Sequence, residues 1–133
     1  MFIKARGRYL TMIAVLGSAL LLPGVVQARS TKKQSASFVV TYPHHQNVRF
    51  DADYYRRSHI PLVKRVMKPD RLVLIEGVPR GASPASYVMI AHLEFASSDA
   101  LEAALAHPDM ALVRSDVPRF TDIKPVVMFG KTD

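Results

Sequence analysis

The chain contains no cysteine among its 133 residues. It therefore forms no disulfides, has no thiol nucleophile and offers no thiolate ligand to a metal ion. A glycine-rich phosphate loop, a dinucleotide-binding fingerprint and a Ser-His-Asp signature are also missing from the sequence. The motifs that mark nucleotide-dependent enzymes and serine hydrolases are thus absent, and any chemistry has to come from other side chains.

The histidines show no spacing typical of a metal site. His44 and His45 are neighbours in a turn-like segment, and no His-x-His or HExxH pattern accompanies them. Adjacent loop residues rarely bind the same ion, so we expect no metal and no other cofactor. His107 precedes Pro108 and is expected on the surface at a helix break.

Residues 1–28 have the pattern of a targeting segment. Lys4, Arg6 and Arg8 precede an apolar run over 10–22, and small side chains lead up to Ala28. The run is shorter than the roughly 20 residues of a membrane-spanning helix. We expect a signal peptide cleaved after Ala28 and export to a periplasm, the alternative being an uncleaved N-terminal membrane anchor.

Without this segment the chain keeps 15 basic and 11 acidic residues, a net charge of +4 instead of +7. This mild excess gives no reason to expect nucleic acid as a partner. Residues 29–36 are polar and predict a flexible tail. Residues 37–133 are the right length for one small domain.

The segment 52–67 predicts an amphipathic helix. Asp51 can cap its first turn, while Tyr55, His59 and Val63 recur at helical spacing on one face. Pro61 lacks a backbone N–H and crowds the preceding turn, so a kink or short break is expected beside His59.

The remaining segments complete a β-α-β-β-α-β order. Strand patterns cover 37–42, 71–78, 87–95 and 124–130, and a second helix starts at Ser97 or Ser98. A short helix to about residue 114 and a loop over 117–122 are expected before the last strand. This order predicts an α+β, ferredoxin-like fold, a four-stranded antiparallel sheet with both helices on one face.

The sheet is expected to pair with a second copy through its other face. In 87–95 both alternating faces are fairly apolar, whereas a face in contact with water should be polar. Two such faces would enclose a cavity in a homodimer, giving a dimeric α/β barrel.

The candidate site residues are three aromatic or imidazole side chains of the first helix and two polar residues of the third strand. We assign His59 and Tyr55 as catalytic, and Tyr54, His92 and Glu94 as substrate-binding. A buried imidazole can act as acid, base or hydrogen-bond donor near neutral pH. The competing interpretations are a core histidine with satisfied nitrogens for His59, and a polar residue at a dimer seam for His92.

Three stretches together resemble the EthD family, named for ethyl tert-butyl ether degradation. They read FDADYYRRSHIPLV, YVMIAHLEFASSDALEAALAHPDM and DVPRFTDIKPVVMFG, and the likeness runs from about Phe38 to Gly130. The resemblance implies a ferredoxin-like fold that dimerises into an α/β barrel. It places the family's motif histidine on His59 and its aromatic pair on Tyr54 and Tyr55. The wider superfamily includes cofactor-free monooxygenases, lactone isomerases, polyketide cyclases and haem proteins.

Two functions follow as hypotheses. The first is a cofactor-independent enzyme, of the oxidoreductase or isomerase and cyclase kind, acting on a small hydrophobic or aromatic molecule in the barrel cavity with His59 as acid or base. The second is a non-catalytic periplasmic binding protein for a small ligand. A haem protein, with His59 or His92 as axial ligand, is a third.

Overall fold

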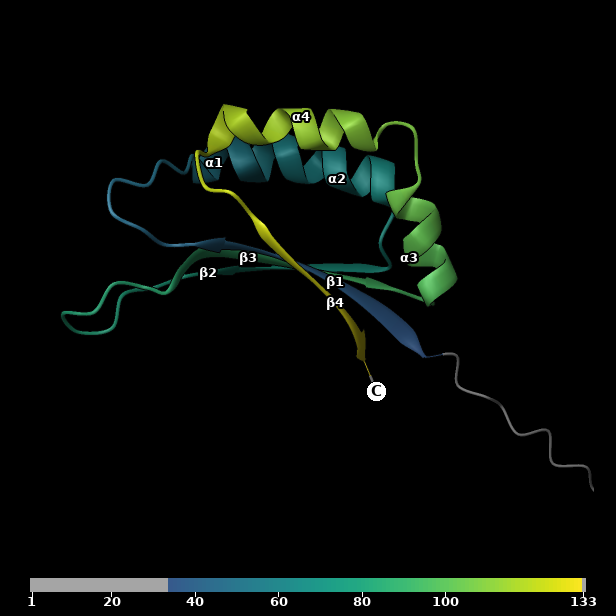
Figure 1. The fold of residues 1–133 in the computed structure, drawn as a ribbon, viewed down its shortest axis with the longest axis horizontal. Coiled ribbons are helices and arrows are strands. Elements are labelled where there is room, and N and C mark those ends of the chain that lie inside the picture. The colour runs from purple at the N-terminus through teal and green to yellow at the C-terminus, as the bar shows by residue number, and fades with distance from the viewer. Residues whose placement is uncertain (1–33, 133) are drawn as a thin grey trace, which may run out of the picture. The chain divides into compact units, whose positions relative to one another are not determined.

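The computed structural model describes residues 34–132 (Figure 1). The expected signal peptide over 1–28 and most of the polar tail lie outside the described residues. The elements, in chain order, are β1 (Ser35–Pro43), α1 (Ala52–Tyr54), η1 (Tyr55–His59), α2 (Ile60–Met67), β2 (Arg71–Glu76), β3 (Tyr87–Phe95), α3 (Ser98–Leu105), α4 (Met110–Phe120) and β4 (Val126–Thr132).

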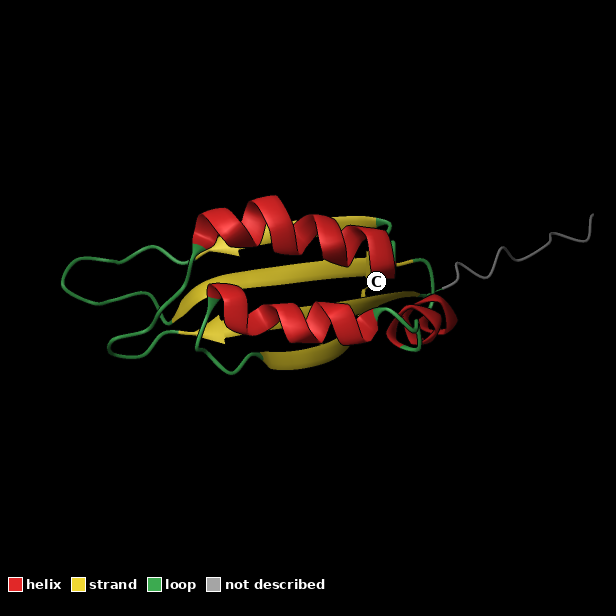
Figure 2. Cartoon of the chain, turned by 90° about the horizontal axis from the view of Figure 1, so that it is seen from above, coloured by secondary structure: helices red, strands yellow, loops and turns green. Residues whose placement is uncertain are grey.

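The four strands form one antiparallel sheet in the order β2-β3-β1-β4. The continuous helix α1-η1-α2 and the helix α4 lie side by side across one face of this sheet (Figures 1 and 2). The short helix α3 packs at one end of the sheet, against β1, β3 and α2. The expected ferredoxin-like α+β fold is confirmed, with helices on one face only.

Side chains of β3 alternate between the two faces. Met89, Ala91, Leu93 and Phe95 point to the helices and are 0–3% exposed. On the face without helices, which we call the open face, His92 and its neighbours on β3 are only partly covered. Phe95 leads directly into the turn before α3, as expected, so His92 lies on the opposite face from the helices.

The helix over residues 52–67 begins and ends where the sequence predicts. The Asp51 side chain accepts a hydrogen bond from the backbone N–H of Tyr54 at 2.9 Å and caps the helix. The predicted break beside His59 is wrong: Ile60 has helical φ and ψ of −63° and −42°. Instead, η1 is a single wide turn in which the Ile60 N–H bonds to the Tyr55 carbonyl. A π turn inserts one extra residue, so the helix absorbs Pro61 without interruption.

The predicted end of the last helix is also wrong. Residues 117–120, expected in a loop, form the last turn of α4, and Pro118 lies inside the helix. Phe120 is completely buried, which stabilises this turn against the roughly 3 kcal/mol that an internal proline costs. The Arg49 guanidinium also donates to the carbonyls of Pro118 at 2.8 Å and Arg119 at 3.3 Å. The end of α4 is therefore stabilised by the packing of Phe120 and by the hydrogen bonds from Arg49, which is distant only in the sequence.

The open face and the edge strand β4 carry much exposed apolar surface. Ile75, Val126 and Met128 are 52%, 55% and 57% exposed. On the helix side of β4, Val127 and Phe129 are also exposed, because β4 is an edge strand with a neighbour on one side only. This surface is what the sequence pattern led us to expect for an interface between two copies.

Within residues 34–132, no helix is long and apolar enough to cross a membrane. In the same range, histidine and acidic side chains form no group of three or more that could hold a metal ion.

Candidate functional site

His59 lies in the layer between the helices and the sheet. It ends the π turn η1, and its side chain is 5% exposed. The ring stacks on Tyr55 with centroids 5.4 Å apart and contacts Phe120 of α4 at 4.6 Å. An imidazole is thus held among aromatic rings at the junction of two helices.

A carboxylate from α4 holds one nitrogen of this ring. Asp116 Oδ2 lies 2.9 Å from His59 Nδ1, and Asp116 Oδ1 accepts the Tyr54 hydroxyl at 2.8 Å. The carboxylate is itself mostly covered, with 12% of its side chain exposed. Arg119 Nε lies 3.7 Å from Oδ1 on the solvent side. Asp116 therefore connects the first helix to the last through two side-chain hydrogen bonds.

This geometry sets the protonation state of His59. A carboxylate facing Nδ1 favours the proton on that nitrogen, which leaves the lone pair of the neutral ring on Nε2. Burial lowers the pKa of His59 below its ordinary 6.5, and the hydrogen bond and charge of Asp116 oppose this effect. The ring is consequently neutral at neutral pH and can accept a proton at Nε2.

The two tyrosines of the predicted site have different surroundings. Tyr55 is 1% exposed and packs edge-on against Tyr42 at 5.6 Å, and burial raises the pKa of its hydroxyl well above the ordinary value. Burial likewise raises the pKa of Tyr42 to about 12. Tyr54 is half-buried, and its hydroxyl donates a hydrogen bond to Asp116 Oδ1. The structure therefore places Tyr54 as a positioning residue for the carboxylate and Tyr55 as a packing partner of the ring.

The other two predicted site residues are elsewhere. His92 and Glu94 lie on the open face, so the sheet separates them from His59. The structure therefore does not bring the five residues into one group, because the helix carrying His59 covers the opposite face of the sheet. Glu76, at the end of β2, forms an ion pair with Arg56.

His92 has polar neighbours of its own. Its Nε2 is 2.9 Å from Ser37 Oγ, and its Nδ1 is 3.8 Å from Glu94 Oε1. Arg71 NH1 lies 3.4 Å from the same Glu94 oxygen. These four side chains come from three neighbouring strands, and we call them the open-face cluster.

The sequence did not single out Asp116 or Ser37. Asp116 lies beyond residue 114, where the sequence predicts the end of the helix, so it was assigned to no helical face. A helical register through Phe120 would have placed Asp116 and Phe120 on one face at a spacing of four residues. Ser37 meets His92 only through the antiparallel register of β1 and β3, for which the sequence holds no local signal.

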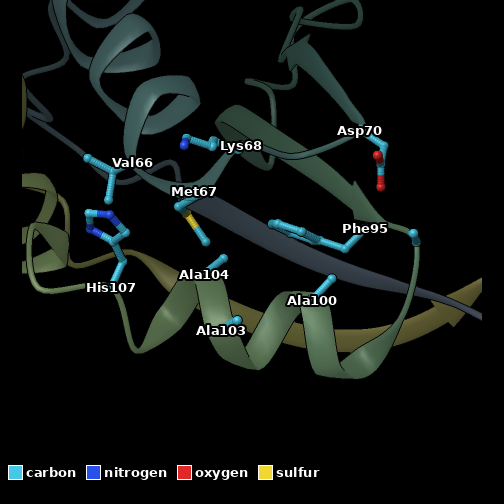
Figure 3. Close-up of a pocket in the computed structure, with 10 residues that line it drawn as sticks. Val66, Met67, Lys68, Asp70, Phe95, Ala100, Ala103, Ala104 and His107 are labelled. Carbon is cyan, nitrogen blue, oxygen red and sulfur yellow. The ribbon is translucent and has the colours of Figure 1, made fainter.

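A separate depression lies at the far end of the first helix, between α2, α3 and the end of β3. It has a volume of about 380 Å³, and its lining includes Met67, Phe95, Ala104 and His107 (Figure 3). His107 Nδ1 accepts the backbone N–H of Asp109 at 3.1 Å. Neither His59 nor the open-face cluster takes part in its lining.

Comparison with known proteins gives a family and a fold. The model of the EthD domain matches residues 43–124. An EthD-like protein from Ralstonia eutropha JMP134 is 24% identical, with a TM-score of 0.68 over 74% of this chain and 91% of that chain. A search of the curated proteins finds no match.

Two further solved structures share the fold at lower identity. A dimeric ferredoxin-like protein of unknown function from Thermobifida fusca is 10% identical, with a TM-score of 0.53 over 76% of this chain and 93% of that one. SnoaB, a cofactor-independent oxygenase from Streptomyces nogalater, is 13% identical, with a TM-score of 0.50 over 75% of this chain and 96% of that one.

Proposed function

The chain belongs to the EthD family, and from this premise we propose that it is a cofactor-independent enzyme acting on a small hydrophobic or aromatic molecule. The observation that carries the proposal is the buried contact of 2.9 Å between His59 Nδ1 and Asp116 Oδ2. It leaves Nε2 as the one nitrogen of His59 that is available to a substrate. The similar fold of a cofactor-independent oxygenase is compatible with this chemistry.

The reaction starts with proton transfer. His59 Nε2 takes a proton from an acidic C–H or O–H group, and the bonding electron pair stays on the substrate as an enolate or phenolate. The Asp116 carboxylate then stabilises the imidazolium that has formed on His59. An isomerase or cyclase would return the proton to another atom, whereas an oxygenase would pass the electrons to O₂.

The surroundings of the ring favour an apolar substrate. Tyr55 and Phe120 flank His59, and Tyr42 and Phe50 extend the same aromatic cluster with centroid distances of 5.0–5.8 Å. Aromatic walls bind planar apolar molecules well, and one hydrogen-bonding nitrogen among them fixes orientation.

Exchange of substrate protons for deuterium tests the proposal without knowledge of the product. A panel of small enolisable ketones and phenols is incubated with the protein in D₂O, and exchange is followed by proton NMR. We expect His59→Gln to slow exchange by about 10²-fold or more. The exposed His45 provides the matched control, His45→Gln, which should keep the rate. Equal rates for His59→Gln and the unaltered protein would contradict the role of His59.

A second function is favoured by the small exposure of His59, whose side chain is only 5% accessible. In this alternative the protein binds a small ligand without converting it, and His59 supplies one hydrogen bond. Native mass spectrometry of the protein from its own host distinguishes the two. An intact molecule that is retained and remains unchanged on incubation supports the binding protein, whereas release of an altered molecule supports the enzyme.

We also propose that the protein works as a homodimer formed through the open face. The exposed apolar side chains of this face, such as Ile75 and Met128, support the proposal, and a dimeric protein shares the fold. Sedimentation velocity should show a dimer, and Ile75→Lys should shift it to monomer. The control is Leu112→Lys on α4, a residue that is equally exposed at 51% but lies outside the open face. A dimer unaffected by Ile75→Lys would place the interface elsewhere.

The pattern of residues 1–28 supports an exported protein whose mature chain starts at Arg29. N-terminal sequencing of the protein purified from its host tests this. A start at Arg29 agrees with cleavage, and a start at Met1 in the membrane fraction would indicate an anchor.

A further inference from the structure

The open-face cluster contains a hydroxyl and a base in direct contact. Ser37 Oγ is 2.9 Å from His92 Nε2, and Ser37 is 4% exposed. On the same face, Val39 is next along β1 and Ile90 is next along β3, while Glu94 is the register partner of Ser37. A serine and a histidine in hydrogen-bond contact are the two groups that nucleophilic catalysis requires.

The neighbouring carboxylate orients the imidazole for this role. Glu94 Oε1 lies 3.8 Å from Nδ1, which is an electrostatic contact and too long for a direct hydrogen bond. Its negative charge still favours the proton on Nδ1, so that Nε2 accepts the Ser37 hydroxyl proton. Arg71 NH1, at 3.4 Å from the same oxygen of Glu94, gives this carboxylate a second charged neighbour.

The sheet leaves space beside the serine. Gly130 of β4 is the register partner of Ser37, so no side chain stands at that position of the open face. On the other side of Ser37, the side chains of His92 and Glu94 are 28% and 26% exposed. The cluster is therefore in contact with solvent through His92 and Glu94, on the open face that becomes the inner face of the proposed dimer.

We propose that Ser37 is the nucleophile of a second, independent site that accepts acyl groups from small aryl esters. The Ser37 hydroxyl gives its proton to His92 Nε2 while Oγ forms a bond to the acyl carbon. The bond from the acyl carbon to the aryl oxygen breaks, and the departing phenolate takes the proton from His92. In a slower second step, His92 Nε2 takes a proton from water as its oxygen bonds to the acyl carbon. The bond from that carbon to Ser37 Oγ breaks, His92 returns the proton to Oγ, and the acid is released.

The geometry also limits the substrates to reactive esters. β1 is hydrogen-bonded to β3 on one side and to β4 on the other, so the amides around Ser37 are committed to the sheet. Backbone donors to the oxyanion typically contribute about 10²–10³ in rate, and this site lacks that contribution. Esters with good leaving groups should react slowly, and amides should not react.

Acetylation by 4-nitrophenyl acetate tests the proposal. The protein is mixed with the ester, its intact mass is followed, and the modified residue is located by peptide mass spectrometry. We expect one acetyl group on Ser37, none in Ser37→Ala, and acylation slower by about 10²-fold in His92→Gln. Glu94→Gln should slow the step less, because its contact with Nδ1 is long.

Matched controls come from exposed residues of the same types. Ser86→Ala and His45→Gln, both altered in exposed loops, should be acetylated like the unaltered protein. Acetyl groups on lysines or tyrosines with Ser37 unmodified would overturn the proposal, and this readout on the unaltered protein does not depend on how a variant folds. Deuterium exchange at His59 is measured in a separate assay, so failure of one proposal leaves the other standing.

Discussion

Two histidines face two carboxylates on opposite sides of one sheet, and the pairs differ in burial. His59 and Asp116 are 5% and 12% exposed and 2.9 Å apart, whereas His92 and Glu94 are 28% and 26% exposed and 3.8 Å apart. Both carboxylates face Nδ1, so both leave Nε2 as the proton acceptor.

The difference shows what burial adds to the same chemical pair. Between the helices, Asp116 is the acceptor for two donors that have little contact with water, so the carboxylate is needed for stability as well as for orientation. On the open face, water can replace Glu94 at little cost. Loss of the carboxylate should therefore cost the buried pair more stability than the exposed pair.

The largest effect that separates the pairs is on stability. Asp116→Ala leaves the Tyr54 hydroxyl and the His59 Nδ1–H without their acceptor and should lower the free energy of unfolding by about 3 kcal/mol. Glu94→Ala should cost less than about 1 kcal/mol. Urea denaturation of both variants measures the contrast. Similar losses for the two would mean that burial does not distinguish the pairs.

A smaller effect is expected from the hydroxyl that supports Asp116. Tyr54→Phe removes its 2.8 Å hydrogen bond and should lower the free energy of unfolding by about 1 kcal/mol. In the Asp116→Ala background the same change should cost much less, because its partner has gone. A double-mutant cycle by urea denaturation measures the coupling. Additive losses would show that the contact contributes little in solution.

The smallest effect is the dependence of stability on pH. Because the pKa of His59 is lower in the folded protein than its ordinary 6.5, the unfolded chain binds more protons between these two values. Stability is therefore complete above about pH 6.5 and decreases as the pH falls toward the folded pKa. Thermal unfolding at a series of pH values should show this slope, and His59→Gln should reduce it. A slope unchanged in His59→Gln would assign it to another group.

Local patterns predicted the elements but only part of the contacts. The helix over 52–67 could be predicted from its capping residue and its terminating residues, and the strand over 87–95 from the alternation of its side chains. These signals all lie in neighbouring residues. The end of α4 could not be predicted in this way. Pro118 is tolerated there because Phe120 is buried and because Arg49, which is distant in the sequence, donates a hydrogen bond to the Pro118 carbonyl. The pairing of Asp116 with His59 depends on helix packing, and the pairing of Ser37 with His92 depends on strand register. The sequence alone therefore did not identify Asp116 or Ser37 as candidate site residues.

The most direct test of the central claim, that burial keeps His59 neutral while Asp116 fixes its proton on Nδ1 and leaves Nε2 free, is an NMR titration of the imidazole nitrogens. Long-range ¹H–¹⁵N spectra report which nitrogen carries the proton in each ring. We predict the proton on Nδ1 of His59 at neutral pH, a pKa below 6.5, and a further decrease in Asp116→Asn, because the opposing effect of the carboxylate charge is lost. A proton on Nε2 of His59 at neutral pH, or a pKa that Asp116→Asn leaves unchanged, would contradict the claim.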